Sequence, residues 1–332
     1  MRAPKGEWGE GFINFTSNDY LGLSRHPEVV AAGVAAAELY GAGARASRIA
    51  GGNHPLFSEF EEKIAAYKGY EAATVFGSGY LANLGVITAL EPEVVYADRL
   101  AHACIIDAVK LAGAKLVRFL HNDMADLARR IDRPGLVVSE EVFSMDGDAA
   151  PVGELMGFGM PVMIDGAHSL YKPQTSNLKP QIYVGTMSKA LGSYGGYVCG
   201  SKTFIEYLNT KARPLIYSTA LPPFAVGAAI KALEIIERDR PYVRAVENAD
   251  YLRSRVTGDG SRGVIIPVIM GDEEKVLAAE EILRENGILV AAIRPPTVPK
   301  GTARLRISIT AAHTKSEIDK LANVIAGLTR NP

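Results

Sequence analysis

This chain has little cysteine and no excess of charge of one sign. Its 332 residues include two cysteines, Cys104 and Cys199, which lie far apart and outside any CxxC pair. This spacing excludes a disulfide framework and a cysteine-built zinc site, and it favours a reducing compartment. The formal net charge is −1, so electrostatics give no reason to expect nucleic acid or an anionic membrane as a partner.

Long apolar runs are missing as well. No stretch reaches the roughly 18 apolar residues of a membrane span, and the start, MRAPKGEWGEGFINF, lacks the apolar segment of a signal peptide. Apolar residues still make up 48% of the chain and charged residues 22%, an ordinary balance for a globular protein with a sizeable core. We therefore expect a cytoplasmic protein with neither a nucleic-acid nor a membrane partner.

Short apolar runs alternate with helical periods between about residues 70 and 220. Helices are predicted at 80–90, 102–112 and 123–131. Strands are predicted at 72–76, 94–98, 116–119, 136–139, 161–165, 182–186 and 196–200. Strands that are apolar on both faces and separated by helices indicate a mostly parallel sheet covered on both sides, which is an α/β fold.

The pattern changes after residue 224. Helices are predicted at 224–238 and 241–256, followed by a strand at 263–269, a helix at 272–286, strands at 288–293 and 303–310, and a helix at 314–328. This order is typical of a small α+β domain. We expect an N-terminal segment over residues 1–40, a large domain over 41–225 and a small C-terminal domain over 226–332.

Lys189 stands in an unusual setting, the segment VGTMSKALGSYGGYVCG at 184–200, with no acidic residue near it in sequence. A buried ammonium is unfavourable, and burial lowers its pKa. An amine held as an imine avoids this penalty. Asp165 ends a predicted strand 24 residues earlier, and a pyridine cofactor bound as a lysine imine needs an acidic partner for its ring nitrogen. A capping role for Asp165 is the alternative.

Glycine and hydroxyl residues supply candidates for a phosphate site. Gly77 and Gly79 lie in a predicted strand–turn–helix, VFGSGYLANLGVI, where free N–H groups at the helix start favour an anion. Glycine needed only for turn geometry is the alternative. The hydroxyl candidates flank the Lys189 turn or precede the helix at 224–238: Thr186, Ser188, Ser218 and Thr219. The last two are equally compatible with a helix cap.

Two further polar segments follow predicted strands. His102 begins a helix in ADRLAHACIIDAV, where a structural histidine is the alternative to a cofactor contact. The loop SEEVFSMDGDAAP gathers Glu140, Ser144, Asp146 and Asp148. Some of these acids suit a turn around Gly147, and their spacing does not match a calcium loop. We expect no metal site.

Three motifs in order, DGAHS, GTMSKALGSYGGYVCG and IYSTALPP, resemble those of the α-oxoamine synthases. NFTSNDYLGLSRHP at 14–27 is also similar to that family, and the resemblance runs from about residue 12 to 328. It implies pyridoxal phosphate as cofactor and condensation of an amino acid with an acyl-CoA, with loss of CO₂. It also implies a homodimer with active sites shared between subunits. The implied fold is the PLP-dependent transferase fold type I, with a mostly parallel seven-stranded sheet in the large domain and a small C-terminal α+β domain.

Within that family, AAIRPPTVPKGTARLRISITAAHT at 291–314 resembles the branch that joins L-alanine to pimeloyl-CoA, or to a pimeloyl carrier protein, in biotin biosynthesis. Other possibilities are a glycine-using branch (the 5-aminolevulinate or 2-amino-3-oxobutyrate type), an aminotransferase or decarboxylase on the same fold, and a non-catalytic subunit or regulator. Retention of Lys189, Asp165, His102 and His168 argues against a catalytically dead subunit.

The resemblance implies a role for each matching residue. Lys189 would carry the cofactor and act as acid and base, Asp165 would hold the pyridinium proton, His102 would stack on the ring, and His168 would bind its phenolate region and share in reprotonation. The implied cofactor contacts are Gly79, Tyr80, His102, Glu140, Ser144, Asp165, His168, Thr186, Ser188, Lys189, Ser218 and Thr219. Ser218 and Thr219 would come from the partner subunit. The implied substrate contacts are Asn18, His102, Arg294, Thr297 and Arg306, and Arg306 would clamp the carboxylate through its fork of N–H groups.

The chain departs from the family pattern in three segments. Only Arg2 and Lys5 supply positive charge before the NFTSNDYLGL region, the segment SLYKPQTSNLKPQ at 169–181 replaces a glycine-rich loop, and the connection at 153–161 is trimmed. We expect these changes to broaden the range of acyl donors. A panel of thioester chain lengths tests this expectation, and a sharp preference for the pimeloyl chain would contradict it.

Overall fold

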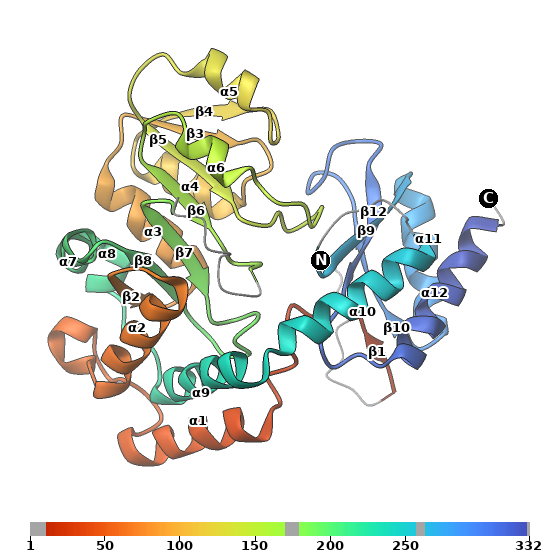
Figure 1. The fold of residues 1–332 in the computed structure, drawn as a ribbon, viewed down its shortest axis with the longest axis horizontal. Coiled ribbons are helices and arrows are strands. Elements are labelled where there is room, and N and C mark those ends of the chain that lie inside the picture. Colours follow the sequence, from red (N-terminus) through yellow and green to blue (C-terminus); the bar gives the residue numbers. More distant parts are fainter. Residues whose placement is uncertain (1–10, 170–178, 257–262, 331–332) are drawn as a thin grey trace. The chain divides into compact units, whose positions relative to one another are not determined.

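The computed structural model describes residues 11–169, 179–256 and 263–330, in two compact units. The large unit comprises Gly22–Phe143 and Ala149–Asp239, and the small unit comprises the chain up to Leu21, the segment Ser144–Asp148 and the chain from Arg240 onward. Figure 1 labels their helices and strands. The expectations about Arg2, Lys5 and most of the segment 169–181 fall outside the described residues.

A seven-stranded sheet forms the centre of the large unit. Its strands run in the order β2-β8-β7-β6-β5-β3-β4. Their bounds are β2 (Ala72–Phe76), β3 (Val94–Asp98), β4 (Lys115–Phe119), β5 (Leu136–Glu140), β6 (Val162–Asp165), β7 (Ile182–Thr186) and β8 (Gly196–Gly200). β8 is antiparallel to both of its neighbours, and the pairs from β7 to β4 are parallel. The predicted α/β fold with a mostly parallel sheet is confirmed.

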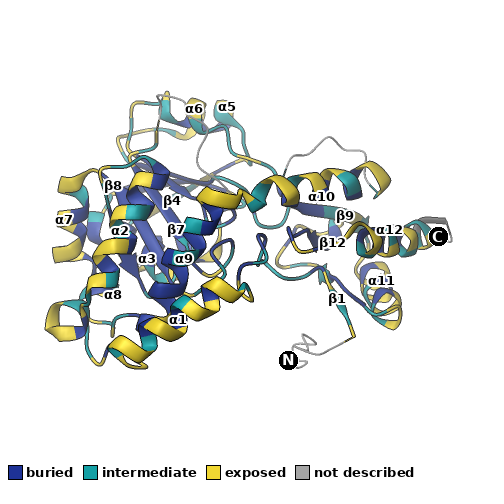
Figure 2. Ribbon diagram, turned by 60° about the horizontal axis from the view of Figure 1, so that its bottom comes forward, coloured by how far each residue is buried: buried dark blue, intermediate teal, exposed yellow. Residues whose placement is uncertain are grey.

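Helices cover both faces of this sheet. One face carries α3 (Gly79–Leu90), α4 (Ala103–Leu111), α7 (Lys202–Lys211) and α8 (Arg213–Ile216), and the other carries α2 (Pro55–Lys68) and α9 (Pro223–Asp239), with α1 (Pro27–Tyr40) packed on α9. Two short helices, α5 (Met124–Arg130) and α6 (Val152–Met156), follow β4 and precede β6, and a π-turn η1 spans Arg48–Gly52. Figure 2 shows the central strands as buried and the outer helix faces as exposed.

Burial on both faces explains the continuous apolar runs of the central strands. Val137, Val138, Met163 and Val184 are fully buried, as expected for parallel strands between two helical layers. α3 is apolar on nearly all sides because it packs against both the sheet and α4. The core therefore holds the carboxyl ends of β3, β5, β6 and β7 in fixed positions.

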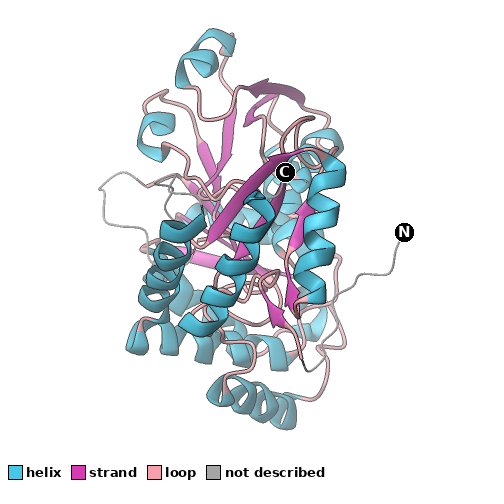
Figure 3. Ribbon diagram, turned by 90° about the vertical axis from the view of Figure 1, so that its right-hand side faces the viewer, coloured by secondary structure: helices cyan, strands magenta, loops and turns pink. Residues whose placement is uncertain are grey.

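The small unit has a three-stranded antiparallel sheet in the order β11-β12-β9 and a parallel pair, β1 with β10. The strand bounds are β1 (Ile13–Asn14), β9 (Ile265–Gly271), β10 (Ile288–Leu289), β11 (Ala291–Ile293) and β12 (Ala303–Ser308). The helices are α10 (Pro241–Val256), α11 (Glu273–Glu285) and α12 (Lys315–Arg330) (Figure 3). The single strand expected at 288–293 is two strands, because the chain changes partner from β1 to β12 at Val290.

The boundaries of the compact units differ from the expected ones at residues 40 and 225. α9 packs along α1 and α2, so the large unit continues to Asp239. At the other end, β1 pairs with β10, and the Phe15 ring stacks on His313 with centroids 4.2 Å apart. These contacts assign the first described residues to the small unit. In the described part of the chain, no helix has both the length and the apolar character that crossing a membrane requires.

Candidate active site

Polar side chains end four adjoining strands of the large sheet. Asp98, Glu140, Asp165 and Thr186 are the last residues of β3, β5, β6 and β7, and Glu140 and Asp165 are register partners across β5 and β6. Because ligands of open α/β sheets bind beyond the carboxyl ends of the strands, this edge is the candidate active site. We call it the carboxyl edge.

Asp165 is buried and held by two hydrogen bonds. Its side chain is only 5% exposed. Asn83 Nδ2 donates to Oδ2 at 2.7 Å, and the Ala167 N–H donates to Oδ1 at 2.8 Å. Each carboxylate oxygen has two lone pairs, so both oxygens can still accept a further hydrogen bond. Asp165 therefore has a fixed orientation and spare acceptor capacity.

Lys189 and His168 contact each other, and His168 follows Asp165 by three residues in the chain. Lys189 Nζ lies 2.9 Å from His168 Nε2, and His168 is 6% exposed. Lys189 sits in a tight turn after β7, closed by the Gly192 N–H donating to the Lys189 carbonyl at 2.9 Å. Asp165 ends β6, Lys189 follows the neighbouring strand β7, and Lys189 contacts His168 directly.

His102 caps the start of α4. Its Nδ1 accepts a hydrogen bond from the Cys104 N–H at 3.2 Å and lies 2.9 Å from Cys104 Sγ. Desolvation lowers the pKa of His102; Asp165 and Asp107 oppose the shift, and Lys189 adds to it. These contacts favour a neutral imidazole near neutral pH. Stacking on a cofactor ring stays a prediction.

Glu140 is buried at the end of β5, with 3% of its surface exposed. Burial raises its pKa well above the ordinary range, and the nearby Asp165 carboxylate raises it further, against a hydrogen bond from the His102 backbone and the charge of Lys189. Its Oε1 atom has no hydrogen-bond partner among the described residues. An orphaned buried oxygen at this edge is a position where a polar ligand can supply the missing partner.

The expected phosphate residues come together at the start of α3. Gly79 begins the helix, and Ser78 caps it by accepting from the Leu81 N–H. A Cβ on Gly79 would lie 3.4 Å from Thr186 Cβ, and a Cβ on Gly196 would lie 2.5 Å from the Gly79 nitrogen. Only glycine at position 196 permits this close approach. The helix start is therefore packed against the end of β7, with its first N–H groups available to an anion.

The neighbouring hydroxyl groups bond among themselves and to the backbone. Thr186 Oγ1 donates to the Gly195 carbonyl at 2.8 Å and lies 3.0 Å from Ser188 Oγ. Tyr80 is exposed on α3 and donates to Asp107 Oδ2 at 2.7 Å. The structure thus brings Thr186 and Ser188 to the phosphate candidate, and it turns the Tyr80 hydroxyl toward α4.

Ser218 and Thr219 lie between α8 and α9. They line a small cavity together with Phe76 and Gly77 from the end of β2. They therefore adjoin the glycine turn of their own chain. The expected contribution of these two hydroxyls to a partner subunit stays a prediction.

Arg306, an expected substrate contact, belongs to the small unit. It lies on β12 and is 5% exposed. Its Nε donates to the Ser144 carbonyl at 2.5 Å and Nη1 to Ser308 Oγ at 2.9 Å; Nη2 donates to Asn18 Oδ1 at 3.2 Å and to Tyr20 Oη at 3.3 Å. These four contacts therefore place a protein acceptor on each of the three guanidinium nitrogens.

Ser144 belongs to the small unit and meets Arg306 through its backbone carbonyl. Its expected hydroxyl contact with the cofactor stays a prediction. Arg294 and Thr297 are exposed and form one turn after β11, in which the Thr297 N–H donates to the Arg294 carbonyl at 3.1 Å. Their expected substrate contacts are likewise untested.

Sequence reasoning missed Asn83 and Tyr20. Asn83 is a polar residue within the otherwise largely apolar α3, four residues after Gly79, and this was the available signal. Tyr20 is fully buried; burial raises its pKa to about 12, which Arg306 partly opposes. Its place in the NFTSNDYLGL motif marked the segment, although nothing in the sequence marked Arg306 as its partner.

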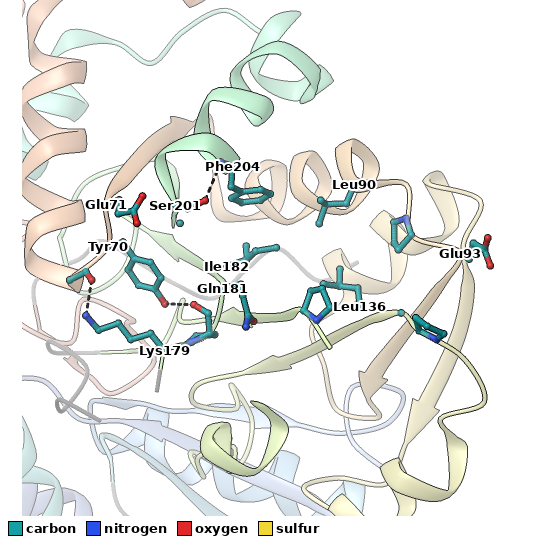
Figure 4. A pocket seen from close by; sticks show the side chains of 17 residues that line it. Tyr70, Glu71, Leu90, Glu93, Leu136, Lys179, Gln181, Ile182, Ser201 and Phe204 are labelled. Carbon is teal, nitrogen blue, oxygen red and sulfur yellow. Dashed lines mark hydrogen bonds between the residues drawn. The ribbon is translucent and has the colours of Figure 1, made fainter. Parts of the chain in front are cut away.

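A cavity of about 730 Å³ lies at the opposite edge of the large sheet (Figure 4). Leu136 and Ile182, the first residues of β5 and β7, line it together with Tyr70 and Phe204. Lys179 Nζ donates to the Gly69 carbonyl at 2.7 Å on its border. The cavity faces the amino ends of the strands, away from Asp165 and Lys189, so volume alone does not mark the candidate site.

Comparisons with known proteins agree with this geometry. The family model for class I and II aminotransferases matches residues 10–325. An 8-amino-7-oxononanoate synthase of Maricaulis maris is 43% identical over 345 residues, covering 96% of this chain and 87% of that protein. A serine palmitoyltransferase solved with PLP superposes with a TM-score of 0.90 at 32% identity, over 96% of this chain and 87% of the other. An 8-amino-7-oxononanoate synthase of Francisella tularensis superposes with a TM-score of 0.85 at 27% identity, over 97% and 99%. The chain therefore belongs to the class I and II aminotransferase family and, within it, to the α-oxoamine synthases, which are pyridoxal-phosphate-dependent acyltransferases.

Proposed function

We propose that this protein condenses L-alanine with a pimeloyl thioester, with loss of CO₂, which is the reaction of 8-amino-7-oxononanoate synthase in biotin biosynthesis. Relatives of that name at 43% and 44% identity, each matched over 96% of this chain, support the proposal. The observation that carries it is the carboxyl edge. There Asp165 accepts hydrogen bonds from two donors, and the Lys189 amine contacts His168.

The residues at the carboxyl edge fit pyridoxal phosphate. Asp165 suits the ring nitrogen because its oxygens keep free lone pairs, and Lys189 supplies the amine that binds the aldehyde. The start of α3, packed closely by Gly196, suits the phosphate, and the orphaned Glu140 Oε1 lacks a polar partner. When bound, the cofactor supplies an electron sink that stabilises negative charge at the substrate α-carbon.

The chain's own residues would move the protons. Lys189 Nζ is the group that would take and return the proton at the α-carbon, and His168 Nε2, 2.9 Å away, orients it and shares that proton. Asp165 would keep the ring nitrogen protonated, because an anion beside a cation favours its charged form. His102 would present a neutral, flat ring.

Binding of the alanine carboxylate by Arg306 requires an exchange of hydrogen bonds. A two-pronged contact through Nη1 and Nη2 needs one N–H from each nitrogen, and Nη2 already contacts two protein acceptors, Asn18 Oδ1 and Tyr20 Oη. Those two contacts are the longest of the four, at 3.2 and 3.3 Å. We therefore expect Asn18 or Tyr20 to release Nη2 when the substrate binds.

The assembly and location proposed for the protein rest on the family resemblance and on the free thiols. We propose a homodimer in which Ser218 and Thr219 serve the partner's site. Cys104 and Cys199 are both free and buried, which supports a cytoplasmic location, where thiols stay reduced. Cross-linking and gel filtration test the dimer.

One experiment tests the function. Purified protein with pyridoxal phosphate is mixed with L-alanine and pimeloyl-CoA, and free thiol, CO₂ and the amino-ketone product are measured. We expect all three in equal amounts from wild type and none from Lys189→Ala, which should also lose the visible cofactor band. Turnover with glycine in preference to alanine would move the protein to a glycine-using branch, and a colourless protein that ignores the cofactor would refute the proposal.

A further inference from the structure

A second cluster of polar side chains packs against the turn at 165–168, which contains Asp165 and His168. Lys68, the last residue of α2, is 4% exposed, and Tyr183 on β7 is 2% exposed. Lys68 Nζ donates to Tyr183 Oη at 2.9 Å, and Tyr183 Oη donates to Glu141 Oε2 at 2.7 Å. A tyrosine hydroxyl thus bridges a buried ammonium and a carboxylate. We call these three residues the Lys68–Tyr183–Glu141 relay.

The relay touches the turn at 165–168 from two sides. A Cβ built on Gly166 would lie 1.9 Å from Tyr183 Oη, so the hydroxyl occupies the space that any other residue at 166 would fill. On the second side, the Glu141 N–H donates to the Asp165 carbonyl at 2.8 Å. The turn is therefore packed against the hydroxyl and hydrogen-bonded to the residue that accepts from it.

Lys68 extends the relay to the far end of the same turn. Its Nζ lies 3.4 Å from Ser169 Oγ, and the Ser169 N–H donates to the Gly166 carbonyl at 3.0 Å. Burial lowers the pKa of Lys68 against the charge of Glu141, and burial raises the pKa of Tyr183 well above its ordinary value. Burying a charged side chain is rarely a source of net stability, which favours a role in geometry.

We propose that Tyr183 is a positioning residue for catalysis: with Lys68 and Glu141 it holds the 165–168 turn, and through that turn it sets Asp165 against the cofactor and His168 against Lys189. The proposal rests on the proposed function for its kinetic part only. Tyr183 touches none of the reacting groups in this arrangement, so its effect is transmitted by the backbone of Gly166 and Glu141.

The test compares Tyr183→Phe with Tyr96→Phe. Tyr96 is a matched control because it is also a fully buried strand tyrosine whose hydroxyl donates to a carboxylate, Asp132 Oδ1 at 3.0 Å, at another place in the same sheet. We expect Tyr183→Phe to weaken pyridoxal phosphate binding about tenfold in an absorbance titration. We also expect kcat to fall about tenfold with KM for pimeloyl-CoA unchanged, since small misplacements of reacting groups act on the chemical step.

Two more variants make the result decisive. Gly166→Ala adds the carbon that Tyr183 Oη excludes, and we expect a larger loss of cofactor affinity, about 100-fold. Glu141→Gln keeps a hydrogen-bond acceptor for Tyr183 but removes the charge that faces Lys68, and we expect a fall of kcat in the same direction as Tyr183→Phe. If Tyr183→Phe does not fold, Glu141→Gln decides by the same criteria.

Clear results would overturn the proposal. Folded Tyr183→Phe with cofactor affinity and kcat within twofold of wild type would do so. Equal losses in Tyr183→Phe and Tyr96→Phe would also do so, because they would indicate general destabilisation. Wild-type protein that binds pyridoxal phosphate yet releases no thiol from pimeloyl-CoA with alanine would refute the proposed function. The titration of cofactor affinity would then still decide the role of Tyr183.

Discussion

Asp165 in the large unit and Arg306 in the small unit are both buried charged groups, yet their partners leave them in different states. Asp165 accepts two hydrogen bonds and keeps lone pairs for a third group. Arg306 contacts four protein acceptors, which lie against all three of its guanidinium nitrogens. Asp165 can thus be held in place and still accept from a ligand, whereas a ligand of Arg306 would meet protein acceptors at every guanidinium nitrogen. If Asp165 binds the cofactor and Arg306 the substrate carboxylate, as proposed, only Arg306 has to exchange hydrogen bonds on binding.

Among the variants that test this comparison, we expect the largest effect from Arg306→Lys. Lysine keeps the charge but lacks the planar fork, so a two-pronged grip on a carboxylate is lost. We expect KM for L-alanine to rise by about 100-fold, with a smaller fall in kcat, in steady-state kinetics. Arg304→Lys is the matched control, because Arg304 lies two residues away on β12 and pairs with Asp146. An unchanged KM in Arg306→Lys would remove Arg306 from the substrate site.

We expect the second largest effect, on cofactor affinity, from Asn83→Ala. It removes one of the two donors to Asp165 and leaves the Ala167 N–H. A hydrogen bond to a charged group is worth about 1.5–3 kcal/mol, so we expect cofactor affinity, measured by absorbance titration, to fall about tenfold or more. Thr88→Ala on the same helix serves as control, since Thr88 donates to the Leu84 carbonyl within α3. Full affinity in Asn83→Ala would mean that Ala167 alone orients the carboxylate.

Tyr20→Phe tests whether Arg306 exchanges hydrogen bonds when the substrate binds. This change removes one of the two acceptors that contact Nη2, and with it the hydroxyl that donates to Asn18 Oδ1 at 3.0 Å. We expect KM for alanine to fall by up to about threefold, while the free energy of unfolding drops by about 1 kcal/mol because a buried hydrogen bond is lost. Kinetics and denaturant unfolding measure the two effects. A rise in KM would show that Tyr20 orients Arg306 and does not compete with the substrate.

The smallest effect concerns protonation in the small unit. Burial lowers the pKa of His313 below its ordinary 6.5, against opposing contributions from the Asn14 carbonyl and Glu317. The unfolded chain then binds this proton more readily than the folded one, so stability is full above about pH 6.5 and falls as the pH drops below it. Unfolding of wild type and His313→Gln between pH 5 and 8 measures this. An equal pH slope in both would assign the effect elsewhere.

The sequence predicted the sheet well because its signals are local. Seven apolar runs bounded by turns gave seven strands within a residue of their predicted ends. The strand at 288–293 was predicted as one piece because its composition does not reveal that its two halves pair with different strands. The packing of α9 on α1 and α2, which extends the large compact unit to Asp239, is likewise not visible in the composition around residue 225.

The residues of the candidate site likewise fall into those that the sequence identified and those that only the structure identified. Lys189, Asp165, His168 and His102 could be named because each follows a strand within a distinctive segment. Asn83, Tyr20 and Tyr183 could not, because their partners lie 82, 286 and 42 residues away in the chain. Distances of that kind depend on how helices and strands pack, and nothing in the neighbouring residues records them.

Residue type and order alone determined which groups this chain can bring to its chemistry: an amine between glycine-rich turns, a carboxylate at a strand end and an arginine in a late strand. The tertiary structure decided which of those groups are already committed. Hydrogen-bond capacity is a property of each side chain, but the neighbours that use it arrive from distant segments when the core closes. Asp165 consequently retains acceptor capacity, and Arg306 has a protein acceptor at each of its three nitrogens.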